Sequence, residues 1–136
     1  MSHRILIADD SQDTLEMLEV FLEFSGWKVY CASTLAEARA RLDTDIVDAV
    51  ILDRWFNDED GLKLCRELKA RLPQLPVVVI SGAAYQADLE EAAKAGCDAY
   101  LVKPFDVDEL SRVITQMLAA APRKAAGAPR LFSSAV

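Results

Sequence analysis

The chain has 136 residues, of which 52% are hydrophobic and 27% charged, a composition typical of one globular domain with a single core. Its formal net charge of -7 argues against broad binding to a nucleic acid backbone. No apolar run reaches the ~18 residues of a membrane span, and a single histidine, His3, leaves little material for a zinc site or for Ser-His-Asp catalysis.

The three cysteines, Cys31, Cys65 and Cys97, lie far apart and form no C-x-x-C pair. Because they are odd in number and unclustered, we expect reduced and mostly buried thiols, as in a cytoplasmic protein. The amino end also lacks the apolar region of a secretion signal.

Two strand–helix units are predicted in the first part of the chain. Residues 4–8 form an apolar strand, and Ser11 is placed to cap a helix that stops at Gly26. Residues 27–32 have the pattern of a second strand, and Thr34 opens a second helix in a capping-box pattern.

Three more units of the same kind follow. Short apolar runs predict strands over residues 47–52, 77–80 and 99–102. Amphipathic patterns predict the helices after them, over residues 61–72, over residues 85–95 and from residue 106 onwards.

This alternation of apolar strands and amphipathic helices predicts an α/β fold with a parallel sheet covered by helices on both faces. We expect one domain over residues 1–120. Residues 121–136 are mostly Ala, Pro, Gly, Ser and basic residues, so we expect a flexible tail or the start of a linker there.

Polar side chains follow four of the predicted strands at the point where each strand ends. Asp9 and Asp10 follow the first strand, Asp53 the third, Ser81 the fourth and Lys103 the fifth. Because the carboxyl ends of parallel strands meet at one edge of a sheet, we expect these side chains to converge. Each of them alone is more often a helix cap or a loop residue, but their joint placement favours a functional site.

The chemistry of this set favours phosphoryl transfer. Three carboxylates in one pocket repel each other unless a cation joins them, and hard oxygen ligands without His or Cys favour magnesium. Lys103 adds a positive charge and Ser81 a hydroxyl donor, as a cage for a phosphoryl group needs. Asp53 is then the candidate nucleophile, which forms an aspartyl phosphate.

The chain resembles the receiver domain of two-component response regulators, over residues 4 to about 120. The matching motifs are, in chain order, Asp9-Asp10, Asp53, Asp60-Gly61, Ser81-Gly82 and Lys103-Pro104-Phe105. The resemblance implies a flavodoxin-like doubly wound (βα)5 sandwich whose five-stranded parallel sheet has the order 2-1-3-4-5. It also implies a signalling phosphoacceptor rather than an enzyme, one that assists its own phosphorylation and dephosphorylation.

The resemblance assigns roles around a magnesium ion. Asp53 would be the phosphoacceptor, and Asp10, Asp53 and the backbone carbonyl of Trp55 would bind Mg²⁺ directly. Asp9 would bind the ion through water.

Further roles concern the phosphoryl group and the switch. Ser81 and Lys103 would contact the phosphoryl oxygens, and the peptide bond before Pro104 is expected to be cis. Tyr100 would then turn inward with Ser81, changing the surface of the fourth helix, fifth strand and fifth helix.

The implied partners are a sensor histidine kinase or a histidine phosphotransfer domain, and a downstream protein. A monomer or a phosphorylation-dependent dimer is expected, without nucleic acid or membrane binding by this domain. In relatives the first helix docks the phosphoryl donor. Here Leu15, Val20 and Phe24 add apolar surface to an inner face expected at Met17, Leu18, Phe21 and Leu22. Wide burial under neighbouring helices is the alternative.

The loop after Asp53 departs from the common family pattern. Asn57 stands where a proline is usual, which predicts a less rigid or differently shaped loop. Trp55 is bulky, and we hypothesise that it shields the site from water; covering the loop or meeting a partner is the alternative. Asp58, Glu59 and Asp60 are acidic neighbours that either form a solvated face or strengthen magnesium binding.

Three other classes of protein are weaker fits. A haloacid-dehalogenase-like phosphatase also uses an Asp nucleophile, but it places an acid where this chain has Trp55. A degenerate receiver that binds partners without phosphorylation conflicts with the intact site residues. A flavodoxin requires a phosphate-binding loop after the first strand. Two arrangements suit the receiver itself: a stand-alone protein or a piece of a larger one.

Overall fold

A computed structural model describes residues 3–120 and 130–133. Its main sheet has strand order β2-β1-β3-β6-β7-β8, and all neighbouring strands are parallel. The strands of this sheet are β1 (Arg4–Ala8), β2 (Lys28–Ala32), β3 (Ala49–Asp53), β6 (Val77–Ser81), β7 (Ala99–Val102) and β8 (Arg130–Ser133).

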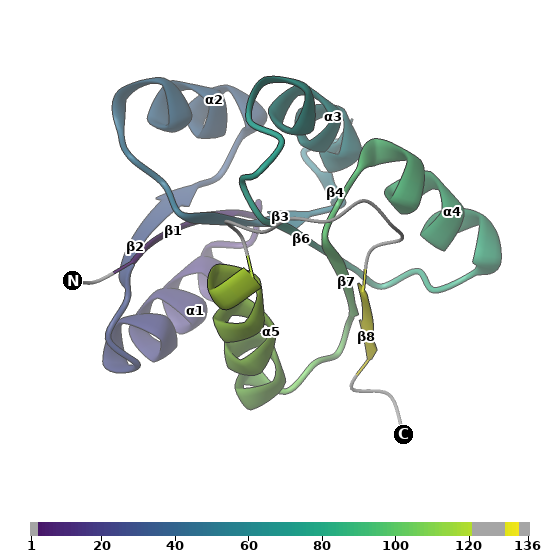
Figure 1. Cartoon of the computed structure of the whole chain (residues 1–136). Helices are drawn as coiled ribbons and strands as arrows, with labels where there is room; N and C mark the ends of the chain where they lie inside the picture. Colours follow the sequence, from purple (N-terminus) through teal and green to yellow (C-terminus); the bar gives the residue numbers. More distant parts are fainter. Residues whose placement is uncertain (1–2, 121–129, 134–136) are drawn as a thin grey trace.

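Helices cover both faces of this sheet. They are α1 (Gln12–Phe24), α2 (Leu35–Thr44), α3 (Gly61–Arg71), α4 (Gln86–Ala95) and α5 (Val107–Ala120). Figure 1 shows α2, α3 and α4 above the sheet and α1 with α5 below it. The order β2-β1-β3-β6-β7 is the flavodoxin-like order 2-1-3-4-5, so the predicted fold class is confirmed. Within the described residues, no helix combines the length and apolar character needed to cross a bilayer.

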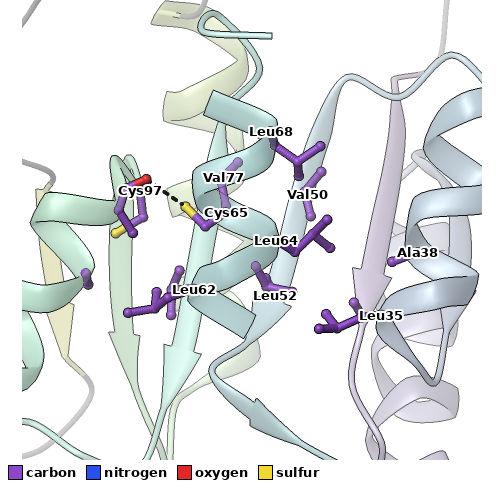
Figure 2. Close-up of a cluster of buried hydrophobic side chains, with 14 of the residues drawn as sticks. Leu35, Ala38, Val50, Leu52, Leu62, Leu64, Cys65, Leu68, Val77 and Cys97 are labelled. Atoms are coloured by element: carbon purple, nitrogen blue, oxygen red, sulfur yellow. Dashed lines mark hydrogen bonds between the residues drawn. The ribbon is translucent and has the colours of Figure 1, made fainter. Parts of the chain in front are cut away.

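The core consists of two apolar clusters, one on each face of the sheet. Alternate residues of a strand point to opposite faces, so Val50 and Leu52 of β3 belong to the cluster under α2, α3 and α4, whereas Ile51 belongs to the one under α1 and α5. Figure 2 shows the first cluster, in which the Cys65 thiol donates a hydrogen bond to a backbone carbonyl. All three cysteines are free, and burial raises the pKa of Cys65 to about 12, which keeps its thiol protonated.

Side-chain caps begin the helices where the sequence predicts them. The Ser11 hydroxyl accepts from the backbone N–H of Thr14, and the Thr34 hydroxyl accepts from that of Glu37. Such caps satisfy N–H groups that have no partner inside the helix and typically contribute about 1 kcal/mol each. They fix the first turns of α1 and α2 beside the carboxyl ends of β1 and β2.

The acidic loop after β3 is a β-hairpin, which differs from the plain loop expected from the sequence. Its strands, β4 (Trp55–Phe56) and β5 (Glu59–Asp60), pair antiparallel. The two residues between them, Asn57 and Asp58, have φ values of 54° and 60°. Positive φ at both central positions defines a tight hairpin turn that Asn and Asp tolerate. Asn57 therefore takes part in a tight hairpin turn, and the lower rigidity expected of the loop stays a prediction.

The inner face of α1 is rotated relative to the sequence prediction. Leu15, Leu18 and Leu22 are the buried residues of this helix, whereas Met17 is half exposed. Val20 and Phe24 remain 70% and 92% exposed. The additional apolar surface expected on this helix is thus present at Met17, Val20 and Phe24, and Leu15 belongs to the core.

The end of the chain differs in part from the expected flexible tail. Residues 130–133 form β8, a sixth strand that lies parallel to β7 at the sheet edge. The rest of the predicted tail, residues 121–129 and 134–136, lies outside the described residues. The domain boundary at residue 120 therefore stays a prediction.

Candidate functional site

Strand ends bring Asp9, Asp10, Asp53 and Lys103 together at one edge of the sheet, where Ser81 ends the neighbouring strand β6. Asp9, Asp53 and Ser81 are buried there. The Lys103 ammonium lies 3.2 Å from Asp53 Oδ1 and 4.0 Å from Asp9 Oδ2. Its own backbone N–H donates to the Ser81 carbonyl at 2.9 Å, which continues the β6–β7 pairing past the strand ends. The sheet register therefore places the lysine beside the carboxylates.

Three carboxylates form a group suited to a hard cation. One oxygen each from Asp9, Asp10 and Asp53 lies within 4.8 Å of the others. Asp9 and Asp53 are buried and Asp10 is exposed, so the group opens to solvent on the Asp10 side. All donors are oxygens, which is the ligand type that Mg²⁺ prefers.

The electrostatics of this group are unfavourable for a buried anion. Burial and the neighbouring charge of Asp9 raise the pKa of Asp53 from 3.8 to about 6, although Lys103 opposes the rise. Burial likewise raises the pKa of Asp9, against the hydrogen bond that its carboxylate accepts from Ser11 N–H. A single lysine does not balance three acids, so the site as built favours an added positive charge.

The hairpin turn is tied directly to this acidic group. The backbone N–H of Asn57 donates to Asp10 Oδ2 at 3.0 Å, and its side-chain amide donates to the Ser33 carbonyl at 2.8 Å. The turn therefore joins the loops that follow β1 and β2. Sequence reasoning missed this role, for which the Asn-Asp pair at a two-residue turn was the available signal.

Tyr100 is turned inward and buried, and its hydroxyl donates to the carbonyl of Ala83. The Ser81 hydroxyl accepts from the Ala83 backbone N–H at 3.1 Å. Ala83 thus links the two residues that the sequence nominates as a switch pair. The peptide bond between Lys103 and Pro104 is cis.

Trp55 is the first residue of β4, and its side chain is 55% exposed. Its indole ring faces the Arg54 guanidinium at 5.0 Å from the ring centre. Asp53 is itself 6% exposed, and the ring contact described for Trp55 is to Arg54, so the shielding role of Trp55 stays a prediction.

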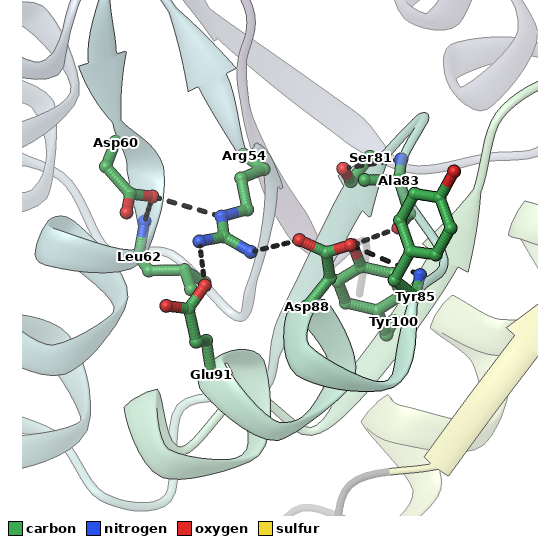
Figure 3. A network of polar contacts seen from close by, with 9 residues as sticks. All are labelled: Arg54, Asp60, Leu62, Ser81, Ala83, Tyr85, Asp88, Glu91 and Tyr100. Atoms are coloured by element: carbon green, nitrogen blue, oxygen red, sulfur yellow. Dashed lines mark hydrogen bonds and ion pairs between the residues drawn. The ribbon is translucent and has the colours of Figure 1, made fainter.

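Arg54, which sequence reasoning did not single out, is buried immediately after Asp53. Figure 3 shows its guanidinium surrounded by the carboxylates of Asp60, Asp88 and Glu91, from the start of α3 and from α4. A single arginine in an acidic loop carries no spacing signal. Its partner Glu91 on α4 lies 37 residues further along the chain, and only the fold brings the two side chains close together.

A doubly wound parallel sheet of order 2-1-3-4-5 defines the flavodoxin-like class of α/β proteins, and here an acidic group and a lysine lie at its carboxyl edge. The model of the response regulator receiver domain matches residues 5–115. This chain belongs to that family.

Curated relatives agree with this assignment. Response regulator MprA of Mycobacterium bovis is 36% identical over 110 residues, which are 81% of this chain and 48% of MprA. Transcriptional regulatory protein GltR of Pseudomonas aeruginosa is 35% identical over 116 residues, 84% of this chain and 48% of GltR. The chain therefore spans about half the length of the curated relatives it matches.

Solved structures give the same fold. A CheY-like receiver domain protein from Methanospirillum hungatei superimposes with a TM-score of 0.85 and 26% identity, over 92% of this chain and 100% of that one. NtrX from Brucella abortus superimposes with a TM-score of 0.82 and 30% identity, over 90% of this chain and 28% of NtrX. Family membership implies a phosphoacceptor role in two-component signalling.

Proposed function

We propose that Asp53 is the phosphoacceptor and takes a phosphoryl group from a histidine kinase or a histidine phosphotransfer domain. The observation that carries this proposal is the position of Lys103, 3.2 Å from Asp53 Oδ1, within the acidic group of Asp9, Asp10 and Asp53. Asp53 lies among other carboxylates and contacts the Lys103 ammonium. This arrangement suits a reaction in which negatively charged phosphoryl oxygens bind together with a metal ion.

Asp10, Asp53 and the Trp55 backbone carbonyl hold Mg²⁺ in this proposal, and Asp9 acts through water. The donor set supports it, since three hard oxygens lie close together, and burial with the charge of Asp9 raises the pKa of Asp53 despite the nearby Lys103. Bound magnesium supplies the positive charge that offsets carboxylate repulsion and stabilises the phosphoryl oxygens.

In the transfer step, an oxygen of the Asp53 carboxylate attacks phosphorus while the bond to the donor imidazole nitrogen breaks. The electron pair of that bond stays on the imidazole, which takes a proton from solvent. Lys103 and Ser81 contact the phosphoryl oxygens, because the ammonium and the hydroxyl both lie at this edge of the sheet. The phosphoryl group stays on Asp53 until water or a relay partner removes it.

The output in this proposal is a change in the surface formed by α4, β7 and α5. Tyr100 lies in β7 and contacts the loop before α4 through Ala83, which supports its role in the switch. The phosphorylated domain then binds a downstream protein, as a monomer or as a dimer, in the cytoplasm.

The docking face for the phosphoryl donor is proposed to include α1. Met17, Val20 and Phe24 are large apolar side chains left exposed on this helix, and they line a shallow pocket with Asp13, Glu16 and Phe21. An exposed apolar patch with an acidic rim, on the helix that follows Asp10, suits a helical partner domain.

Incubation with acetyl phosphate and magnesium, followed by mass measurement, tests the assignment. We expect one phosphoryl adduct on the wild type, none on Asp53→Asn, and none on the wild type after chelation of magnesium. A wild type without adduct under any donor contradicts the proposal and favours a degenerate receiver. Steady turnover of phosphate esters would point to a phosphatase instead.

A further inference from the structure

The backbone of Arg54 joins the phosphoacceptor strand to its neighbour. Its N–H donates to the Ile80 carbonyl at 2.8 Å, so the β3–β6 pairing extends one residue beyond Asp53. Ile80 directly precedes Ser81, which lies at the proposed phosphoryl site. Any shift of the peptide between Asp53 and Arg54 is therefore shared by both strand ends.

The side chain of Arg54 points to the opposite face from Asp53, because successive residues of a strand alternate. That face is the one covered by α3 and α4. Arg54 Nε lies 3.3 Å from Asp60 Oδ1, and Nη2 donates to Glu91 Oε1 at 2.6 Å. Nη1 lies 3.6 Å from Asp88 Oδ1 as an ion pair. We call Arg54, Asp60, Asp88 and Glu91 the Arg54 network (Figure 3).

The network holds the first turns of two helices. Asp60 is the N-cap of α3, since its Oδ1 accepts from the Leu62 N–H at 3.0 Å. Asp88 accepts from the Tyr85 N–H at 3.2 Å at the start of α4. The carboxylate of each aspartate thus accepts a hydrogen bond from a backbone N–H at the start of a helix and also pairs with the Arg54 guanidinium. One arginine therefore connects β3 to the starts of α3 and α4.

Burial makes this connection stiff. The Arg54 side chain is only 4% exposed, and a guanidinium stays charged at any pH at which the protein folds. Releasing it from its partners would leave a charge buried without a counter-charge. A shift at the end of β3 would therefore move the guanidinium against the carboxylates of Asp88 and Glu91 on α4.

Tyr100 lies within the electrostatic reach of the same network. Burial raises the pKa of the Tyr100 hydroxyl and the charge of Asp88 adds to the rise, while Ser81 and Arg54 act to lower it. The Ala83 carbonyl that accepts from this hydroxyl belongs to the loop that leads into α4. The arginine thus lies between the phosphoacceptor strand, the buried tyrosine and α4.

We propose that Arg54 is a positioning residue that couples the phosphorylation state of Asp53 to the position of α4. The coupling runs from the Arg54 peptide through its guanidinium to Asp88 and Glu91. It deepens the proposed function, on which it rests, by naming the contact that carries the change to the switch surface. The coupling requires that α4 moves together with the buried Arg54 guanidinium. Removing either Arg54 or its carboxylate partner on α4 should therefore uncouple the helix from the phosphorylation state of Asp53.

Hydrogen exchange of the α4 amides, residues 86–95, measured before and after phosphorylation by acetyl phosphate with magnesium, tests this coupling. The measured quantity is the ratio of exchange rates between the two states, because a merely loosened helix exchanges faster in both. For wild type we expect a ratio of at least about five-fold. For Arg54→Met and Glu91→Gln we expect a ratio below about two-fold, with the adduct on Asp53 still formed.

Glu90→Gln is the matched control. Glu90 neighbours Glu91 on α4, and its described side-chain bond is to Gln86 rather than to Arg54. It should keep the wild-type ratio. Glu91 is 59% exposed, so Glu91→Gln tests the coupling even if Arg54→Met does not fold.

A wild-type ratio in either Arg54→Met or Glu91→Gln would overturn the coupling and leave the phosphoacceptor role intact. An adduct on the wild type without any change in α4 would have the same meaning. Absence of the adduct itself, seen by mass before any exchange is measured, would remove the proposed function and the coupling together.

Discussion

Asp53 and Arg54 are neighbours in the chain, and both are buried among carboxylates, yet their surroundings have opposite effects. Asp53 meets Asp9 and Asp10, charges of its own sign, and one lysine. Arg54 meets three carboxylates of opposite sign on the other face of the sheet. Successive side chains of a strand point to opposite faces of the sheet. This alternation places Asp53 in a site with too little positive charge and Arg54 beside carboxylates that pair with it.

The difference teaches how one strand end serves two purposes. A charge with too few counter-charges around it can still bind a cation or accept a phosphoryl group, and this suits a reacting residue. A charge that is fully surrounded holds its neighbours in place, and this suits a structural connection. Removing each charge in turn should therefore change stability in opposite directions.

The largest expected effect is the loss of stability in Arg54→Met. The substitution keeps an unbranched side chain but removes the cation, which leaves three carboxylates facing each other. We expect the free energy of unfolding to fall by about 2 to 3 kcal/mol in urea titrations. Arg71→Met is the control, because Arg71 pairs with Asp43 at the exposed surface and should cost less than about 0.5 kcal/mol. A loss of stability in Arg71→Met as large as that in Arg54→Met would contradict the comparison.

Without magnesium, Asp53→Asn should change the free energy of unfolding in the opposite direction, that is, raise it. The pKa of Asp53 is raised from 3.8 to about 6, so the folded protein holds a proton that the unfolded chain releases. Wild-type stability therefore falls as pH rises through the window between these values. At pH ~7.5 we expect the variant to be more stable by about 2 kcal/mol, and near pH ~4 the two should agree. A variant that is less stable at both pH values would show that the surroundings of Asp53 stabilise its carboxyl group instead of destabilising it.

Magnesium affinity sharpens the comparison on the Asp53 side. Asp10→Asn removes an exposed member of the acidic group, and we expect the dissociation constant to rise at least ~10-fold. Trp55 fluorescence reports the titration, since this residue follows Asp53 by two positions. Asp58→Asn tests the alternative roles of the hairpin acids. An unchanged affinity would leave Asp58 as part of a solvated face, and a weakened one would give it an electrostatic role.

The hairpin turn should show a smaller effect. Asn57 has a φ of 54°, a conformation that costs alanine about 1 kcal/mol or more. Asn57→Ala should lower the free energy of unfolding by that amount, and it also removes the bond to the Ser33 carbonyl. Asn57→Gly separates the two contributions, because glycine adopts this φ without strain. Equal losses in both variants would assign the effect to the lost side-chain bond alone.

The smallest expected effect concerns the phosphorylated lifetime. If Trp55 shields Asp53, Trp55→Asn should shorten the half-life of the adduct a few-fold, since about 0.6 kcal/mol changes a rate that much. The measurement is the decay of the adduct by mass after the donor is removed. Trp55→Phe is the control, because it keeps an aromatic side chain. An unchanged or longer half-life in Trp55→Asn would contradict shielding.

The convergence of the strand ends could be predicted from the sequence because the strands are local patterns. Each apolar run ends on a polar residue, and parallel pairing forces these ends to one edge. The hairpin could not be predicted in the same way, because strands of two residues show no periodicity. Their pairing depends on the turn at Asn57 and Asp58.

Arg54 and α1 show two other limits of sequence patterns. Arg54 lies in a loop rich in acids, where a surface ion pair is the ordinary expectation, and its burial depends on Asp88 and Glu91 of α4. On α1, apolar residues occupy more than one side, so the pattern allows several inner faces. Packing against α5 and β2 selects the face that carries Leu15 and leaves Met17 outside.

Gly61 has a consequence for how this domain can vary. Its N–H donates to the Arg54 carbonyl, and a Cβ at this position would collide with the Asp53 carbonyl. The first residue of α3 is therefore fastened to the last residues of β3, and the hairpin between them leaves and returns at the same point. The base of the hairpin is thus closed by backbone contacts, while its tip touches the acidic group through the bond from Asn57 N–H to Asp10. A substitution at the tip therefore reaches the metal-binding carboxylates directly, without passing along the strand that carries the acceptor.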